Sequence, residues 1–273
     1  MPKAKVNGIN INYRIEGQGE PLVMIQGIGA DRTAWRFHTP TFKKHYRVVT
    51  FDNRGVGKSD KPTGPYSTKM MADDTVGLMN HLDIEKAHIL GVSMGGLIAQ
   101  ELAINYPERV LRLVLISTFA RRDESSGLSP ELFQALGYDE GYSEDDFLRN
   151  TPIIEQVATS VYLALNKRLY KIIALLQMPL IKFQIRQMGT TGILGQQEAL
   201  LGHDTADRLG IIKAPTLVIT GSKDRVFKPS SSEVIAELIP NARLVKVDGG
   251  SHSFALEMRS RFNREVLDFL KGD

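Results

Sequence analysis

Short runs of apolar and β-branched residues alternate with longer helical patterns along most of the chain, and this alternation restricts the fold more than any other feature. Two of the runs, 21–25 and 46–51, have the apolar character of strands that are buried on both faces. Further runs of strand character lie at 87–90, 112–116, 216–220 and 243–247. Helical patterns separate the runs at 68–81, 95–106, 230–238 and 259–270. The alternation predicts an α/β fold with parallel strands joined by crossover helices.

The N-terminal run departs from this pattern. Residues 6–14 alternate apolar and polar side chains and contain an Asn7-Gly8 pair. Asn-Gly between alternating residues is a strong signal for a tight hairpin turn. The sequence therefore predicts an antiparallel hairpin at the edge of the sheet.

A second departure lies between about residues 119 and 209, where the strand signals stop. Helical patterns follow one another there, including two that we expect to form separate helices at 167–177 and 179–188. We interpret residues 1–120 and 210–273 as one sheet-based body. Residues 121–209 are then expected to form a helical cap inserted after the sixth strand.

Composition excludes several functional classes. The 273 residues suffice for one large α/β domain, and the absence of cysteine rules out disulfides, thiolate metal sites and cysteine nucleophiles. The 34 basic and 31 acidic residues give a net charge of only +3, unlike the clustered excess of a nucleic-acid binder. Neither an apolar window of about 20 residues nor a secretory signal is visible. We expect a cytoplasmic protein without a membrane span.

Chemistry is concentrated in a Gly-x-Ser-x-Gly motif. Gly91-Val92-Ser93-Met94-Gly95 follows the strand at 87–90 and precedes an amphipathic helix. A sharp turn in that context strains the serine and exposes its hydroxyl above the sheet, while the glycines let neighbouring backbone approach. Ser93 is therefore the predicted nucleophile.

A serine nucleophile needs a base, and the base needs an acid that orients it. Asp224 follows the strand at 216–220, and His252 follows the strand at 243–247. Parallel strands end at the same edge of a sheet, so Ser93, Asp224 and His252 are expected to meet there. Their order along the chain is the one that a strand–turn–helix serine hydrolase requires.

With this motif and this order of residues, the chain resembles the serine hydrolases of the α/β-hydrolase fold over nearly its whole length. The matching segments are Gln26-Gly27-Ile28-Gly29, residues 51–60, residues 214–219 and Gly249-Gly250-Ser251-His252. Residues 203–266 are most similar to the carboxylesterase and 3-oxoadipate enol-lactonase branches. The resemblance implies a mostly parallel eight-stranded sheet flanked by helices.

The same resemblance implies an oxyanion hole. Its two donors would be the backbone N–H groups of Ile28 and Met94, each worth about 10²–10³ in rate. Gln26 departs from the histidine that the family usually has at its position, and glutamine can still brace the loop by hydrogen bonds. The substrate would be a small-molecule ester, and no cofactor or metal is expected.

Other polar residues offer alternatives to His252 as the base and to Asp224 as the acid. His203 and Asp204 could form a base–acid pair, although no strand precedes them and a contact between helices is the simpler interpretation. Asp248 competes with Asp224 for the acid, but it lies only four residues before His252. His88, inside a buried strand, is interpreted as a core histidine.

The predicted cap carries opposite charges in its two halves. Residues 121–155 hold nine acids and three arginines, a net charge of −6, whereas residues 156–197 hold five basic residues and no acid. Such a basic group is usually a solvated face. The sharper hypothesis is that Lys167, Arg168 and Lys171 contact an anionic part of the substrate.

The leading interpretation is a hydrolase that cleaves carboxylic esters through an acyl-enzyme on Ser93. His252 would act as the base, and Asp224 would hold its imidazole. A lactonase, a thioesterase, a carbon–carbon bond hydrolase or a ligand receptor without turnover would use the same residues. The oligomeric state is not encoded in any pattern that we recognise.

Overall fold

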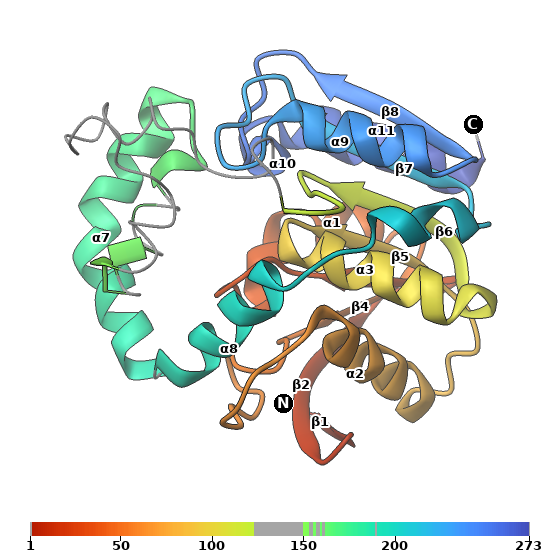
Figure 1. The fold of residues 1–273 in the computed structure, drawn as a ribbon, viewed down its shortest axis with the longest axis horizontal. Coiled ribbons are helices and arrows are strands. Elements are labelled where there is room, and N and C mark those ends of the chain that lie inside the picture. The colour runs from red at the N-terminus through yellow and green to blue at the C-terminus, as the bar shows by residue number, and fades with distance from the viewer. Residues whose placement is uncertain are drawn as a thin grey trace.

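A computed structural model describes residues 2–122, 150–152, 155–156, 159, 162–188 and 190–272 of the chain. Eight strands form one sheet in the order β1-β2-β4-β3-β5-β6-β7-β8. The two pairs that involve β2 are antiparallel, and the other pairs are parallel. The predicted eight-stranded, mostly parallel sheet flanked by helices is confirmed (Figure 1). The strands are β1 Lys3–Val6, β2 Ile9–Glu16, β3 Pro21–Ile25, β4 Arg47–Phe51, β5 Ala87–Val92, β6 Val110–Ile116, β7 Thr216–Gly221 and β8 Ala242–Val247.

The N-terminal hairpin lies at the edge of the sheet, as the Asn-Gly signal predicts. Asn7 and Gly8 connect β1 to β2 with φ values of 47° and 80°. Positive φ at both central residues matches the right-handed twist of the two strands. β2 then pairs with β4, so the hairpin extends the parallel sheet at one side.

Alternate residues of the strands face two separate hydrophobic cores. In β3, Val23 and Ile25 belong to one cluster of buried residues, whereas Leu22 and Met24 belong to the other. Side chains alternate between the two faces of a strand, so one apolar run supplies both cores. This explains why β3, which is covered on both sides, is apolar throughout.

Helices cover both faces of the sheet (Figure 1). The first core includes residues of α2, α3 and α9, and the second includes residues of α1, α10 and α11. The α-helices are α1 Thr39–Phe42, α2 Thr68–His81, α3 Met94–Asn105, α7 Arg168–Met188, α8 Thr190–Leu201, α9 Pro229–Leu238, α10 Phe254–Glu257 and α11 Arg259–Lys271. Short 3₁₀ helices occur at η1 Arg32–Phe37, η2 Pro107–Arg109 and η3 Ala206–Ile211.

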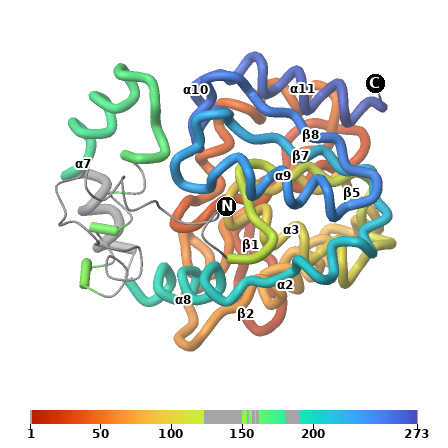
Figure 2. The backbone as a smooth tube through the Cα atoms, turned by 45° about the horizontal axis from the view of Figure 1, so that its top comes forward, coloured from red at the N-terminus to blue at the C-terminus, as the bar shows by residue number. Residues whose placement is uncertain are grey.

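The connection between β6 and β7 holds α7 and α8. Figures 1 and 2 place α7 beside the body, with α8 leading back toward the sheet. The prediction of two helices at 167–177 and 179–188 is wrong, because α7 continues through Pro179 as one helix. A proline inside a helix removes one hydrogen bond and disturbs the turn before it, and here the helix continues on both sides of that loss.

The ends of this connection are anchored to the body. Thr205 donates its N–H to the carbonyl of Ala120 (2.9 Å), and Arg121 pairs with Asp204. The backbones of Gly55 and Gly192 approach so closely that a Cβ on either would collide with the other. The division of the chain at residues 120 and 210 into body and cap stays a prediction.

Among the helices that the structure describes, none combines the length and the apolar character of a membrane span.

Candidate active site

Ser93 lies at the carboxyl end of β5, in the turn that leads into α3. Its backbone has φ 55° and ψ −124°, a conformation that costs a non-glycine residue about 1–3 kcal/mol. The Ser93 N–H donates to the carbonyl of Ile116 (2.9 Å) on β6, and its own carbonyl accepts from Gly96 N–H (2.8 Å) and Thr118 Oγ1 (3.0 Å). These bonds hold the strained backbone in place.

The two glycines of the motif allow the turn to close. A Cβ at Gly91 would collide with the carbonyl oxygen of Gly95. A Cβ at Gly95 would in turn collide with the carbonyl oxygen of Ile25, at the end of β3. The expected close backbone approaches are therefore present, and they press the turn against the neighbouring strand.

Asp224 and His252 meet at the same edge of the sheet. Asp224 follows β7, and its Oδ2 lies 2.8 Å from Nδ1 of His252, which follows β8. Its other oxygen accepts from the N–H groups of Val226 (2.9 Å) and Phe227 (3.0 Å), so both carboxylate oxygens have partners. The Asp224 side chain is fully buried, whereas the imidazole of His252 keeps 11% of its surface exposed.

The loop that carries His252 folds back over β7. The carbonyl of Gly250 accepts from Lys223 N–H (2.8 Å), which holds this loop beside the loop of Asp224. The His252 ring then packs edge-on against Phe227 (5.2 Å between centroids), and Phe227 packs against Phe119, just beyond β6 (5.0 Å). Ser93 Oγ and His252 are not joined by a hydrogen bond in this structure, and such bonds are often long before a substrate binds.

The loop after β3 lies directly against the serine. A Cβ placed on Gly27 would be 3.6 Å from Ser93 Oγ, so the glycine before Ile28 leaves space beside that hydroxyl. Gln26 takes part in bracing this loop, because its carbonyl accepts from the side chain of Asn53 (3.0 Å). The roles of the Ile28 and Met94 N–H groups as oxyanion donors stay predictions.

The matching family decides the identification. Residues 20–257 match the profile of a family described as alpha/beta hydrolase fold, which covers most of the chain. This chain belongs to the α/β-hydrolase family. The sequence resemblance is thereby confirmed, and the protein is a hydrolase of this family.

Several proteins are similar to this chain over nearly their full length. "Putative carbamate hydrolase RutD" of Azorhizobium caulinodans is 29% identical over 269 residues, which cover 98% of each chain. "3-oxoadipate enol-lactonase 2" of Acinetobacter baylyi is 29% identical, covering 96% of this chain and 94% of its own. The crystal structure of the enol-lactonase from Burkholderia xenovorans LB400 superposes with a TM-score of 0.83 at 30% identity, covering 99% and 100% of the two chains.

The histidine and aspartate alternatives have other partners in this α/β hydrolase. His203 is buried and contacts Thr68 Oγ1 (2.8 Å) and Thr205 Oγ1 (3.2 Å), and its burial lowers its pKa to about 4. Asp204 instead pairs with Arg121. Asp248 is exposed, and its side chain accepts from Ser222 Oγ (3.4 Å) rather than from His252.

Two other histidines are also buried. Burial is the main cause that lowers the pKa of both His38 and His88. His88 lies in β5 with its ring packed edge-on against Tyr46, in keeping with its interpretation as a core residue. His38 shares a hydrogen bond of 2.9 Å with Asn263.

The basic residues proposed to meet the substrate lie at the start of α7. Lys167 directs its ammonium group to the backbone carbonyl of Glu257, in α10. The ammonium of Lys171 lies over the ring of Tyr162, 5.1 Å from its centroid, and Arg168 is exposed. A contact between these three side chains and a substrate stays a prediction, and Lys167 already has a structural partner.

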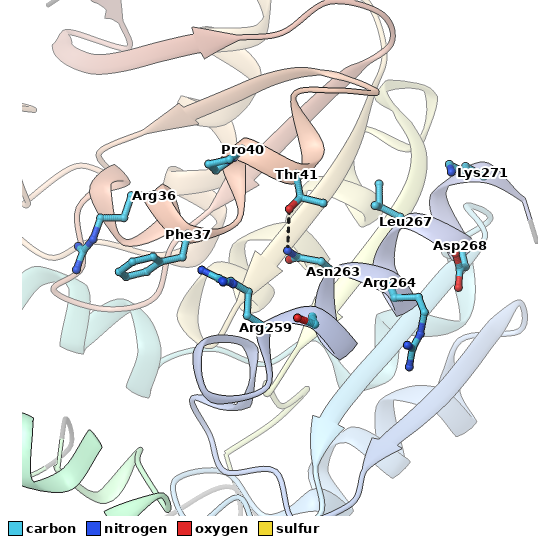
Figure 3. Close-up of a pocket in the computed structure, with 11 residues that line it drawn as sticks. Arg36, Phe37, Pro40, Thr41, Arg259, Asn263, Arg264, Leu267, Asp268 and Lys271 are labelled. Atoms are coloured by element: carbon cyan, nitrogen blue, oxygen red, sulfur yellow. Dashed lines mark hydrogen bonds between the residues drawn. The ribbon is translucent and has the colours of Figure 1, made fainter. Parts of the chain in front are cut away.

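Two grooves adjoin the corner between α10 and α11. One, of about 820 Å³, runs between α7 and α10 and is lined by Ala174, Ser253 and Glu257 among others. The other, of about 600 Å³, is shown in Figure 3, where the Arg259 side chain extends toward Phe37 and Asn263 donates to Thr41. Neither of these two grooves is lined by Ser93, Asp224 or His252.

Two supporting residues were missed by the sequence analysis. Gln196, in α8, accepts from Gly29 N–H (2.9 Å) and donates to the carbonyl of Arg54 (2.7 Å), which ties α8 to the loop after β3. Glu257 is a buried carboxylate five residues beyond His252. Its position in the otherwise apolar segment 254–258 is a signal that could have drawn attention to it. Within the described residues, no three acidic or histidine side chains gather as metal ligands do.

Proposed function

We propose that this α/β hydrolase cleaves carboxylic esters, lactones included, by acyl transfer to Ser93. The observation that carries the proposal is the hydrogen bond of 2.8 Å between His252 and Asp224, at the sheet edge where the strained Ser93 turn lies. A carboxylate can only accept, so Nδ1 of His252 donates to it and Nε2 is left as an acceptor. This is the tautomer that a base acting on a serine hydroxyl needs.

The reaction follows from these roles. Nε2 of His252 takes the proton of Ser93 as Oγ attacks the ester carbonyl, and Asp224 stabilises the resulting imidazolium. The oxyanion develops toward the N–H groups of Met94 and Ile28. The imidazolium then protonates the leaving alkoxide. Water, deprotonated by His252, finally releases the acid from Ser93.

Lactones are a specific second candidate within this mechanism. Two of the similar proteins named above are enol-lactonases, and a third has a name that refers to carbamates. In a lactone the leaving alkoxide stays attached to the acyl group, so the same four steps give one hydroxy acid. A thioester would release a thiolate and a carbon–carbon bond would release a carbanion, whereas a carbamate carries a nitrogen on the attacked carbonyl.

The test is turnover on a matched panel of substrates. p-Nitrophenyl esters of increasing acyl length, simple lactones, an aryl carbamate and an acyl thioester would be offered to the parent and to Ser93→Ala. Removing the nucleophile of a comparable triad costs about 10⁶-fold in kcat. We expect multiple turnover of an ester or lactone by the parent and loss of that activity in Ser93→Ala. Equal rates for both proteins would refute the role of Ser93, and binding without turnover would favour a receptor.

The hypothesis about the basic residues is tested on the same panel. The triple variant Lys167→Ala, Arg168→Ala and Lys171→Ala should lose preference for anionic over neutral esters. Unchanged discrimination would leave these side chains with a structural role only.

A further inference from the structure

Glu257 carries a buried carboxylate that the proposed mechanism does not use. Only 6% of this residue is exposed. Its Oε1 accepts from the backbone N–H groups of Asn166 (3.0 Å) and Lys167 (2.7 Å), and its Oε2 accepts from the hydroxyl of Ser251. An isolated carboxylate is costly to bury, and three donors offset that cost here. The carboxylate therefore connects the adjacent backbone N–H groups of residues 166 and 167 to the side chain of Ser251.

The residues on both sides of the candidate base belong to this hydrogen-bond network. Ser251 immediately precedes His252 and is almost completely buried. Ser253 immediately follows it, and its N–H lies within hydrogen-bond reach of both Ser251 Oγ (3.1 Å) and the carbonyl of Ala164 (2.9 Å). Both neighbours of His252 are therefore bonded to Glu257 or to the segment that Glu257 holds.

That segment, residues 164–167, also reaches the loop of the candidate acid. The side chain of Asn166 donates to the carbonyl of Lys223 (3.1 Å), directly before Asp224. The ammonium of Lys167 donates to the backbone carbonyl of Glu257, so the contact is made from both sides. Residues 164–167 thus bridge the loops that present His252 and Asp224.

We infer that Glu257 is a positioning residue, which fixes His252 by joining Ser251 to residues 164–167, just before α7. The inference rests on the proposed function, because it assigns Glu257 to the base of that reaction. Its carboxylate accepts bonds from both sides, so the loop of His252 and the start of α7 are held in one arrangement. A base displaced by about 1 Å can cost 10²-fold in rate.

Positioning makes a different prediction from general stabilisation. A misplaced base slows acylation and lowers kcat, while substrate binding and KM change little. A purely structural role would lower the melting temperature and leave kcat for each active site unchanged. The comparison must therefore be made per active site, counted by titration with a fluorophosphonate that labels the serine.

The experiment uses Glu257→Gln, which keeps the side-chain shape, together with Ser251→Ala and the double variant. Glu101→Gln is the matched control, because Glu101 is also buried but pairs with Arg208 and Asn105. We expect Glu257→Gln to lower kcat by about 100-fold with KM within about twofold. If Glu257 acts through Ser251, the double variant should be no slower than Glu257→Gln, since coupled residues are not additive.

Two outcomes would overturn the inference. One is a Glu257→Gln protein with the parental kcat per site and only a lower melting temperature. The other is a loss of kcat in Glu101→Gln as large as that in Glu257→Gln. A parent that turns over no substrate refutes the proposed function instead. In that case hydrogen exchange tests whether Glu257 joins Ser251 to residues 164–167. We expect faster exchange in both 162–167 and 250–254 when Glu257 is replaced. An unchanged rate in either segment would contradict the inference.

Discussion

Ser93 and His252 lie at the same edge of the sheet, yet they are held in place by different means. Ser93 is held by its own backbone, in a turn that glycines 91 and 95 allow to press against β3. His252 is held by side chains, since Asp224 bonds its ring and Glu257 bonds the residue before it. The Ser93 side depends on close backbone packing together with hydrogen bonds of its own backbone, whereas the His252 side depends on hydrogen bonds made by side chains.

The difference shows which kind of change each side tolerates. A close-packed turn has no room for one added carbon atom, whatever its chemistry. A hydrogen-bonded loop accepts substitutions of equal size and fails when a donor or acceptor is lost. The two sides can therefore be separated by substitutions that alter only shape or only hydrogen bonding.

The largest effect that sharpens this comparison is expected from Asp224→Asn. The amide preserves the shape of the side chain but can favour the wrong tautomer of His252, which in a comparable triad costs about 10⁴-fold in kcat. Asp248→Asn, in the same region but exposed, should keep the parental rate. Steady-state kinetics on the best ester of the panel measures both. A parental rate for Asp224→Asn would remove Asp224 from the mechanism.

A smaller effect is expected from adding one methyl group on the close-packed side. In Gly95→Ala the new Cβ meets the carbonyl oxygen of Ile25, so the turn must open. Overpacking of this kind costs about 3 kcal/mol of unfolding free energy, and the displaced serine should lose activity as well. Gly210→Ala is the control, because the nearest atom to its Cβ is 3.9 Å away. Urea unfolding of the two variants measures the difference. An unchanged unfolding free energy for Gly95→Ala would contradict the packing argument.

The smallest effect is the pH dependence of the unfolding free energy that is expected from His203, which belongs to neither side. Burial lowers its pKa to about 4, whereas the unfolded chain titrates near the ordinary value of 6.5. The unfolded state thus binds more protons between these values. The contribution of the neutral His203 to stability is complete above pH 6.5 and is lost as the pH falls toward 4, by about 2 kcal/mol between pH 7 and pH 5.

His203→Gln should remove this part of the pH dependence, because glutamine can bond both threonines without a proton to gain. His45→Gln is the control at an exposed histidine. Urea unfolding at pH 7 and pH 5 measures the difference. The lowered pKa values of His38 and His88 predict that a smaller slope in the same direction persists. Equal losses for the parent and His203→Gln would show that His203 is not the group that titrates.

The sheet was predictable because each of its strands is encoded locally. The run at 216–220 lies within the observed β7, Thr216–Gly221, and the Asn7-Gly8 pair located the edge hairpin. α7 was mispredicted, since a proline at 179 is a local signal for a helix end. The surrounding helix overrides that signal, and no single-residue rule weighs one lost bond against the many that remain.

The residues of the candidate site differ in the same way in how far the sequence could predict them. Ser93 was predicted from a motif that is contiguous in sequence, and Asp224 and His252 were predicted because parallel strands end together. Glu257 was missed because its role depends on Ser251 and on the backbone of residues 166–167, which lies about 90 positions away in the chain. Contacts of that kind are set by the fold, and a pattern along one chain does not contain them.

The anchoring of the β6–β7 connection has a practical consequence for protein engineering. Thr205 donates to Ala120, and Arg121 pairs with Asp204, so the connection leaves the body and returns to it at one place. Grafting a foreign segment between residues 121 and 204 would require no spacer, because the splice points are already neighbours. The Ser93 turn and the Asp224 loop would stay outside the exchanged stretch. Residues 166 and 167 would lie inside it, so a grafted segment would have to supply the two N–H donors that Glu257 binds in order to keep His252 in place.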